Sequence, residues 1–145
     1  MPVQVSDRLQ RWFQDYGSYH QTRGNKLCHD FGIPMIVASV LGLLACVPLG
    51  PVDLGLAVWG LISLWYWSLD WRVGVPFSAL ALGLWFPARL VPLPALWAMF
   101  VLGWILQFLG HIRYEKKSPA FFTNLRHLLI GPLWVFARRA GYMGA

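Results

Sequence analysis

Histidines are the residues of this sequence best suited to chemistry, and three of the four have a polar residue one helical turn away. The pairs are Tyr16 with His20, Asn25 with His29, and His111 with Glu115. Residues at this spacing share one face of a helix, and a metal-bound imidazole is usually held by such a neighbour. Two interpretations are open. The histidines form a metal site at a membrane surface, or they are ordinary polar side chains that are hydrated at that surface.

Two other residues are weaker candidates. His127 is a candidate metal ligand only because of its position, and it is not predicted to be a required ligand. Asp70, in "LWYWSLDWR", is expected to pair with Arg72 or to cap a turn, with a ligand role as the alternative. The Trp and Phe residues are expected to pack or to face lipid rather than to form a cofactor site.

The elements that must position these residues are predicted to be membrane helices. Hydrophobic residues make up 57% of the chain and charged residues 12%, against about 25% charged in soluble domains. Crossing a bilayer takes about 20 apolar residues. Four uncharged runs approach or reach that length: Phe31–Val52, Leu54–Leu69, Val73–Ala88 and Leu90–Gly110. The middle two cross only if flanking Trp and Arg side chains lie among the headgroups.

The predicted fold is therefore all-α: a polytopic membrane bundle of about four transmembrane helices with interfacial helices at both ends, in a single domain, 1–145. A fifth apolar stretch, Leu128–Phe136, is too short to cross and is expected in the interface or in the bundle. The first 30 residues carry charges with no apolar core among them, so no cleaved signal peptide is expected.

Basic residues give the predicted topology. Of the 12 Lys and Arg residues, only Arg89 falls on the side opposite both termini. The positive-inside rule then places the termini in the cytoplasm, and all four histidines fall on that same side. We expect an integral membrane protein, in a bacterial inner membrane or its equivalent, with a cytoplasmic-facing site. The net charge of +6 suits anionic lipid headgroups. Nucleic acid is not an expected partner, because no groove-reading motif or basic–aromatic platform is present.

His20 and His29 cannot share a metal on one straight helix. Helical residues advance about 100° each, so these two would point in opposite directions. Gly24 lies between them and is a plausible break, which would let two helices turn both imidazoles inward. The ends of the first and fourth spans must then pack together to bring His111 to the same place.

Several other chemistries lack their motifs. The sequence has no phosphate-binding glycine loop, no CxxC pair, and no HExxH or GxSxG. A zinc hydrolase stays open, because imidazole suits zinc and iron alike. Bis-histidine haem ligation is less favoured, because the histidines lie at the ends of the predicted spans and not within them.

Two blocks of this sequence resemble the Mpo-type membrane proteins, which act as Fe(II)-dependent 2-hydroxy fatty acid dioxygenases in fatty acid α-oxidation. The first block is Tyr16, Tyr19, His20, Asn25, His29 and Pro34. The second lies in "WILQFLGHIRYEKKSPAFFTNL" and comprises Trp104, Gln107, Phe108, Gly110, His111, Glu115, Pro119, Ala120, Asn124 and Leu125, with Pro132 beyond it. The motifs span about a third of the chain, and the order of the spans between them also fits.

The resemblance implies an activity: a long-chain 2-hydroxy fatty acid and O2 give the acid one carbon shorter, CO2 and water. It implies Fe(II) held by His20, His29 and His111, with Glu115 as a further catalytic residue, either a ligand or an orienting group. Weaker candidates for the substrate site and its surroundings are Tyr16, Asn25, Gln107, Arg113, Lys116, Lys117 and Asn124. The acyl chain would lie among the spans and the carboxylate against the basic face, with Arg113, Lys116 and Lys117 nearest. Membrane lipids are the other expected partners.

One position departs from the family pattern. The family tends to carry a glutamate a few residues after the proline that matches Pro132, and this sequence has Arg138 near that place. Either that glutamate is dispensable or the chemistry of this member is altered. His127 matches no family histidine. The alternatives to a dioxygenase are a membrane metal-dependent lipid hydrolase and a non-catalytic lipid-binding protein, which metal content and O2 dependence would separate.

Overall fold

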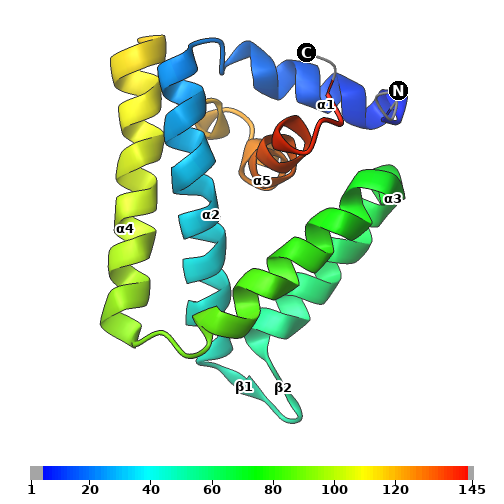
Figure 1. The fold of residues 1–145 in the computed structure, drawn as a ribbon, viewed down its shortest axis with the longest axis vertical. Coiled ribbons are helices and arrows are strands. Elements are labelled where there is room, and N and C mark those ends of the chain that lie inside the picture. The colour runs from blue at the N-terminus through cyan, green and yellow to red at the C-terminus, as the bar shows by residue number, and fades with distance from the viewer. Residues whose placement is uncertain (1–4, 144–145) are drawn as a thin grey trace.

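A pair of antiparallel helices, α2 (Arg23–Ala45) and α4 (Leu93–Leu109), forms the frame of the computed structural model, which describes residues 5–143 (Figure 1). The two helices approach closely at Gly32 and Gly103. A Cβ added to Gly32 would lie 2.8 Å from the Gly103 carbonyl oxygen, and the reverse distance is 2.9 Å. Small residues of this kind let helix backbones pack together where side chains would hold them apart.

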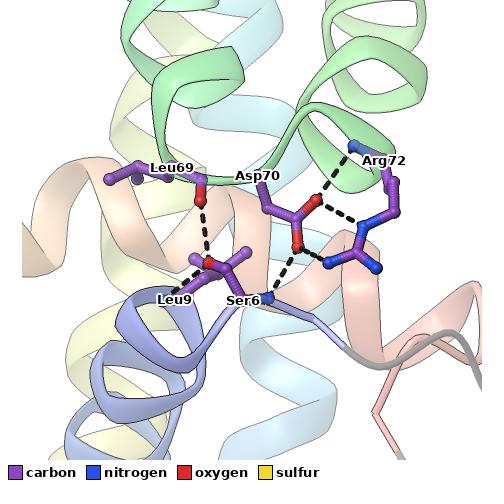
Figure 2. A network of polar contacts seen from close by, with 5 residues as sticks. All are labelled: Ser6, Leu9, Leu69, Asp70 and Arg72. Atoms are coloured by element: carbon purple, nitrogen blue, oxygen red, sulfur yellow. Dashed lines mark hydrogen bonds and ion pairs between the residues drawn. The ribbon is translucent and has the colours of Figure 1, made fainter.

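Helix α3 (Leu54–Ala88) is a helical hairpin with its turn at Asp70, where φ is −164° and ψ is 107°. It follows a short β-hairpin, β1 (Pro48–Leu49) with β2 (Val52–Asp53). The Asp70 carboxylate accepts hydrogen bonds from the Arg72 backbone at 3.0 Å and from the Arg72 guanidinium at 2.9 and 3.0 Å (Figure 2). It also accepts one from the Ser6 backbone N–H at 2.7 Å. The prediction that Asp70 pairs with Arg72 or caps a turn is confirmed.

Two helices, α1 (Asp7–Ser18) and α5 (Arg126–Arg139), lie at the end of the frame where α2 begins and α4 ends (Figure 1). They bury Leu9 and Phe13 of α1 against Ile130, Leu133 and Trp134 of α5 in one core cluster. The apolar stretch Leu128–Phe136 thus packs within the bundle. Between α4 and α5 lie a π-helical segment, Gly110–Glu115, and a 3₁₀ turn, Ala120–Phe122.

The all-α prediction is confirmed for residues 5–143, which are helical apart from the small hairpin and the connections. Within that range, two helices are long and apolar enough to cross a membrane: Arg23–Ala45, and α4 with its π-helical extension, Leu93–Glu115. The arms of α3 match the two middle predicted runs in position, and their crossing stays a prediction. So does the single domain, 1–145, whose ends (1–4 and 144–145) lie outside the described residues.

Candidate metal centre

Three buried histidines from three different elements meet at the end of the α2–α4 frame. His20 follows α1, His29 lies in the second turn of α2, and His111 lies in the π-helical segment; each side chain is buried. Their ring centroids are 4.4, 4.8 and 5.0 Å apart, and one ligand nitrogen from each lies within 4.8 Å of the others. The structure therefore brings together the three residues that the sequence nominated as metal ligands.

Hydrogen bonds fix the tautomers of two of these rings. His20 Nδ1 lies 2.7 Å from the Tyr16 carbonyl oxygen, and His29 Nδ1 lies 3.0 Å from the Asn25 carbonyl oxygen. A carbonyl oxygen only accepts hydrogen bonds, so each Nδ1 carries the hydrogen. Burial lowers the pKa of both rings, so both are neutral and each Nε2 carries a lone pair. The two Nε2 atoms nonetheless face each other at 3.0 Å. Two lone pairs at this distance repel each other unless a cation lies between them.

The donor set fits a metal ion. Two imidazole nitrogens that are about 2.1 Å from one ion and at right angles to each other lie about 3.0 Å apart. That is the separation of the two Nε2 atoms. His111 adds a third imidazole, and its buried Nδ1 has no protein hydrogen-bond partner among the described residues. Three neutral imidazoles on one side of an ion leave positions open on the other, as sites that bind substrate require.

The chain turns between His20 and His29, as predicted, although the break is not at Gly24. Helix α1 ends at Ser18, and α2 starts after Thr22, whose hydroxyl accepts the Asn25 backbone N–H at 3.3 Å. Gly24 lies inside the first turn of α2. A Cβ there would lie 2.3 Å from the Tyr114 ring. Helix capping by Thr22 makes the break, and Gly24 instead lets α2 approach the π-helical segment.

The π-helical segment gives His111 its place. A Cβ on Gly110 would lie 2.3 Å from the Asn25 side-chain oxygen and 3.0 Å from the Cys28 Cβ, so a larger residue would force the Asn25 side chain to move. The segment ends at Lys116, which has a left-handed backbone at φ 55°. π-Helical turns inside α-helices frequently occur at functional sites, and here the turn carries a histidine of the cluster.

Glu115 lies beside the cluster and is bound to the start of α2. Its carboxylate accepts hydrogen bonds from the Thr22 backbone N–H at 2.7 Å, the Thr22 hydroxyl at 3.0 Å and the Asn25 amide at 3.2 Å. It is not one of the groups whose ligand atoms converge. Through Asn25, which accepts the His29 hydrogen bond, Glu115 is connected to one of the imidazoles. The arrangement is that of an orienting group, and whether Glu115 also takes part in catalysis stays a prediction.

Tyr16 packs its ring against His20. The two rings are stacked with centroids 4.1 Å apart and an angle of 9° between their planes. Burial and, to a smaller extent, the nearby His29 together lower the pKa of His20 to about 2, because they outweigh the hydrogen bond to Tyr16. Burial also raises the pKa of the Tyr16 hydroxyl. Both side chains are therefore neutral at ordinary pH, and a neutral imidazole is the form that binds metal.

A cavity of about 70 Å³ adjoins the three histidines. Gln107 and Trp104 line it, and the Nε2 of Gln107 and the Nε1 of Trp104 are buried N–H donors without a protein partner in the described part of the chain. Leaving such donors unpaired costs about 1–3 kcal/mol each. Two spare donors at the edge of a metal centre are suited to oxygen atoms of a ligand. The sequence identifies Trp104 only as a packing residue and a match to the family, because an unpaired indole N–H depends on what surrounds the side chain.

His127 also lines the cavity, although it is outside the converging set. Its Nε2 lies 2.8 Å from the Asp15 carboxylate, a pairing that the sequence does not predict. That His127 is not a required ligand stays a prediction. Asn124 lies two residues before α5, and its side-chain oxygen accepts the Arg126 backbone N–H at 3.2 Å.

The three basic candidates for the substrate carboxylate are exposed. Arg113 lies within the π-helical segment, Lys116 and Lys117 follow it, and none of the three lines the cavity. Arg138, which stands where a glutamate was expected, forms an ion pair with Asp30, the residue that follows His29. Arg139 pairs with the same carboxylate. These pairs join the end of α5 to the segment of α2 that carries His29.

Comparison with known proteins identifies the family of this chain. Residues 6–143 match the family described as 2-hydroxy-palmitic acid dioxygenase Mpo1-like, and the chain belongs to that family. It is similar to the 2-hydroxy-palmitic acid dioxygenase MPO1 of Saccharomyces cerevisiae, with 28% identity over 144 residues that cover 88% of this chain and 79% of the yeast protein. No solved structure matches the chain significantly. The predicted family resemblance is confirmed.

Proposed function

We propose that this protein is an Fe(II)-dependent dioxygenase that converts a long-chain 2-hydroxy fatty acid and O2 into the fatty acid one carbon shorter, CO2 and water. The observation that carries the proposal is the convergence of His20, His29 and His111 with two facing Nε2 lone pairs 3.0 Å apart. Membership in the family described as 2-hydroxy-palmitic acid dioxygenase Mpo1-like supports the substrate class.

The reaction balances with no second reductant. The carbon that bears the hydroxyl is oxidised to a carboxyl carbon, the old carboxyl leaves as CO2, and the substrate supplies all four electrons that O2 takes up. Fe(II), when bound, supplies O2 activation and a site for the hydroxyl and carboxylate of the substrate. The protein supplies three neutral imidazoles, which hold the ion and leave positions open.

The carboxylate end of the substrate is proposed to lie in the cavity next to the histidines. Gln107 Nε2 and Trp104 Nε1 are the unpaired donors there and are suited to its oxygens. Arg113, Lys116 and Lys117 remain candidates for attracting the anion to this end of the protein before it enters, because charge steers an anion without contact. Buried Gln107 and Trp104 are better placed to orient it.

A membrane location is part of the proposal. Large apolar side chains on the outer face of α4 are about half exposed, including Trp97, Val101 and Ile105. An exposed apolar face of this extent fits lipid better than water. We propose four crossings, with the arms of α3 completing the set, and the metal centre at the cytoplasmic face with the basic residues. A long-chain fatty acid is already dissolved in such a membrane.

The test is product analysis with protein purified without oxygen. With Fe(II) and O2, a long-chain 2-hydroxy acid should give the acid one carbon shorter. The unsubstituted acid should not react, and 2-oxoglutarate should have no effect. His111→Ala is the matched inactive control. Turnover that continues after complete iron removal or under strict anaerobiosis would overturn the proposal, and hydrolysis of a lipid ester or amide would favour a metal hydrolase.

A further inference from the structure

A second apolar cavity continues from the metal centre into the bundle. It measures about 190 Å³ and lies between α2, the arms of α3 and the start of α5. Its lining shares Ile36, Val37, Leu128 and Pro132 with the cavity at the histidines. The two cavities therefore adjoin, and none of the residues that line the second one carries a charge.

One face of α2 follows both cavities. His29 and Ile33 line the first, Ile36 and Val37 line both, and Leu41 lines the second. These positions recur at intervals of three and four residues, which keeps them on a single side of a helix. From His29 to Leu41 the helix rises about 18 Å at about 1.5 Å per residue. That length is on the scale of an extended long-chain acyl group.

The opposite wall is held by hydrogen bonds between elements. Trp59 Nε1 donates to the Ser78 carbonyl oxygen at 2.9 Å and joins the two arms of α3. The Tyr66 hydroxyl donates to the Leu129 carbonyl oxygen at 2.6 Å and joins α3 to α5. Because these polar groups are hydrogen-bonded within the protein, mainly carbon atoms face the cavity.

The end of this cavity away from the histidines, here called the closed end, lies against a buried cluster. Leu41, Ala81 and Trp85 form a buried cluster, and Val37, Leu56 and Trp59 pack against it. Leu41 and Ala81 also line the cavity, so this cluster is where the apolar space stops.

We infer that this second cavity, here called the acyl groove, binds the hydrocarbon tail of the substrate, and that Leu41 and Ala81 at its closed end set the preferred chain length. The inference rests on the proposed function for the nature of the head group. The occupant is the tail of a 2-hydroxy fatty acid bound at the histidines, because the groove opens into the cavity beside them and offers a tail no charged group to avoid.

Substitutions at the closed end test the groove. Ala81→Phe fills it, and each methylene that no longer fits should lower kcat/KM about fourfold. The activity profile over a series of 2-hydroxy acids should therefore move to shorter chains, and the shortest acids should keep wild-type activity. Ala79→Phe is the matched control, because Ala79 is two residues away and exposed. An unchanged length profile in Ala81→Phe would overturn the inference while leaving the proposed function intact.

A second measurement does not depend on turnover or on a variant that folds. A 2-hydroxy fatty acid with a photoreactive diazirine at its last carbon is bound to the wild-type protein, and the labelled residues are mapped by mass spectrometry. The label should fall on the α2 and α3 residues at the closed end, near Leu41 and Ala81. Label only on outward-facing residues such as Ile105 or Ile112 would overturn the groove. If the wild-type protein oxidises no 2-hydroxy acid, the proposed function fails, and the labelling still decides the groove.

Discussion

Glu115 binds Thr22 through two hydrogen bonds, from the backbone N–H at 2.7 Å and from the hydroxyl at 3.0 Å, across 93 positions of sequence. The contact joins the end of the α4 extension to the turn that separates His20 from His29. Asn25 connects the Glu115 carboxylate to the His29 imidazole, because its side-chain amide donates to Glu115 and its carbonyl oxygen accepts from His29. Glu115 itself is not one of the residues whose ligand atoms converge.

Glu115→Ala should lower both stability and metal affinity. Thr22 and Asn25 lose their acceptor, which we expect to cost about 1–3 kcal/mol in the free energy of unfolding and about 10–100-fold in metal affinity. Denaturation and metal titration measure these effects, with the exposed Lys117→Ala as control. If Glu115 acts only by orientation, saturating Fe(II) should restore most of the activity; activity that stays absent would show a catalytic role.

Alanine at His20, His29 or His111 should remove bound iron. Each substitution leaves two imidazoles, and three are needed to fill one side of the ion. His127→Ala should retain it, because the His127 ring is paired with Asp15 and lies outside the converging set. Metal analysis of protein prepared without oxygen is the measurement. Full retention of iron in the triple variant would contradict the assignment, and loss in His127→Ala alone would mean that the ligand set is different.

Gln107→Leu and Trp104→Phe should weaken substrate use without loss of iron. Each removes one N–H donor from the cavity, and a lost hydrogen bond to a charged oxygen is expected to lower kcat/KM at least tenfold. Arg113→Ala should have a smaller effect that fades at high salt, because the Arg113 side chain is exposed. Steady-state kinetics with iron quantified in each variant separates the two cases. A larger loss in Arg113→Ala would instead assign the carboxylate to the basic surface.

Asp70 should make stability depend on pH at the hairpin turn. Burial alone would raise the pKa of the Asp70 carboxyl, yet hydrogen bonds from the Arg72 side chain and the Ser6 backbone outweigh burial and hold it below its usual value. Its contribution is therefore complete above the unfolded-state pKa of about 3.9 and is lost as pH falls through the lower folded-state value. The difference in Tm between wild type and Asp70→Asn should be largest near neutral pH and should shrink below about pH 4. A constant difference would contradict this explanation.

Cysteine labelling tests the proposed topology. In a background with Cys28 and Cys46 replaced by serine, a cysteine introduced at Pro51 should react with an impermeant reagent added outside intact cells. One introduced at Ser118, or at the exposed Trp71 beside the turn of α3, should not react until the membrane is opened. Reaction at Ser118 and not at Pro51 would mean that the metal centre faces outward. Reaction at Pro51 and Trp71 but not at Ser118 would mean that the arms of α3 do not cross.

Much of the fold follows from sequence because apolar runs and charges are local signals. The run at Leu90–Gly110 predicts most of α4, and the polar residues around Asp70 predict the turn inside α3. The run at Phe31–Val52 is less exact. Helix α2 begins eight residues earlier, at Arg23, since Thr22 caps it, and it ends at Ala45, where the chain turns into the β-hairpin. Capping and turn chemistry decide such boundaries, and hydropathy does not report them.

The candidate site, too, is predictable from the sequence only in part. Spacing and family resemblance identify His20, His29 and His111 as candidate metal ligands, because the residue type and its position can both be read from the sequence. The pairing of Asp15 with His127 and of Asp30 with Arg138 depends on how α1, α2 and α5 pack, which no local pattern encodes. The unpaired donors of Trp104 and Gln107 are also a property of packing, because a polar atom is unsatisfied only in relation to its surroundings.

His111 lies 82 positions after His29 in the sequence, so an iron ion bound by the three histidines, as proposed, would cross-link distant parts of the chain. An ion held by His20 and His111 closes a chain loop that contains α2 and the whole of α3, so it restricts the unfolded chain much as a covalent bridge would. Occupancy at a hundred times the dissociation constant would add about 2.7 kcal/mol to the free energy of unfolding. A cell short of iron would then hold fewer folded copies of the protein as well as fewer active ones, and its abundance would follow metal supply without any change in synthesis.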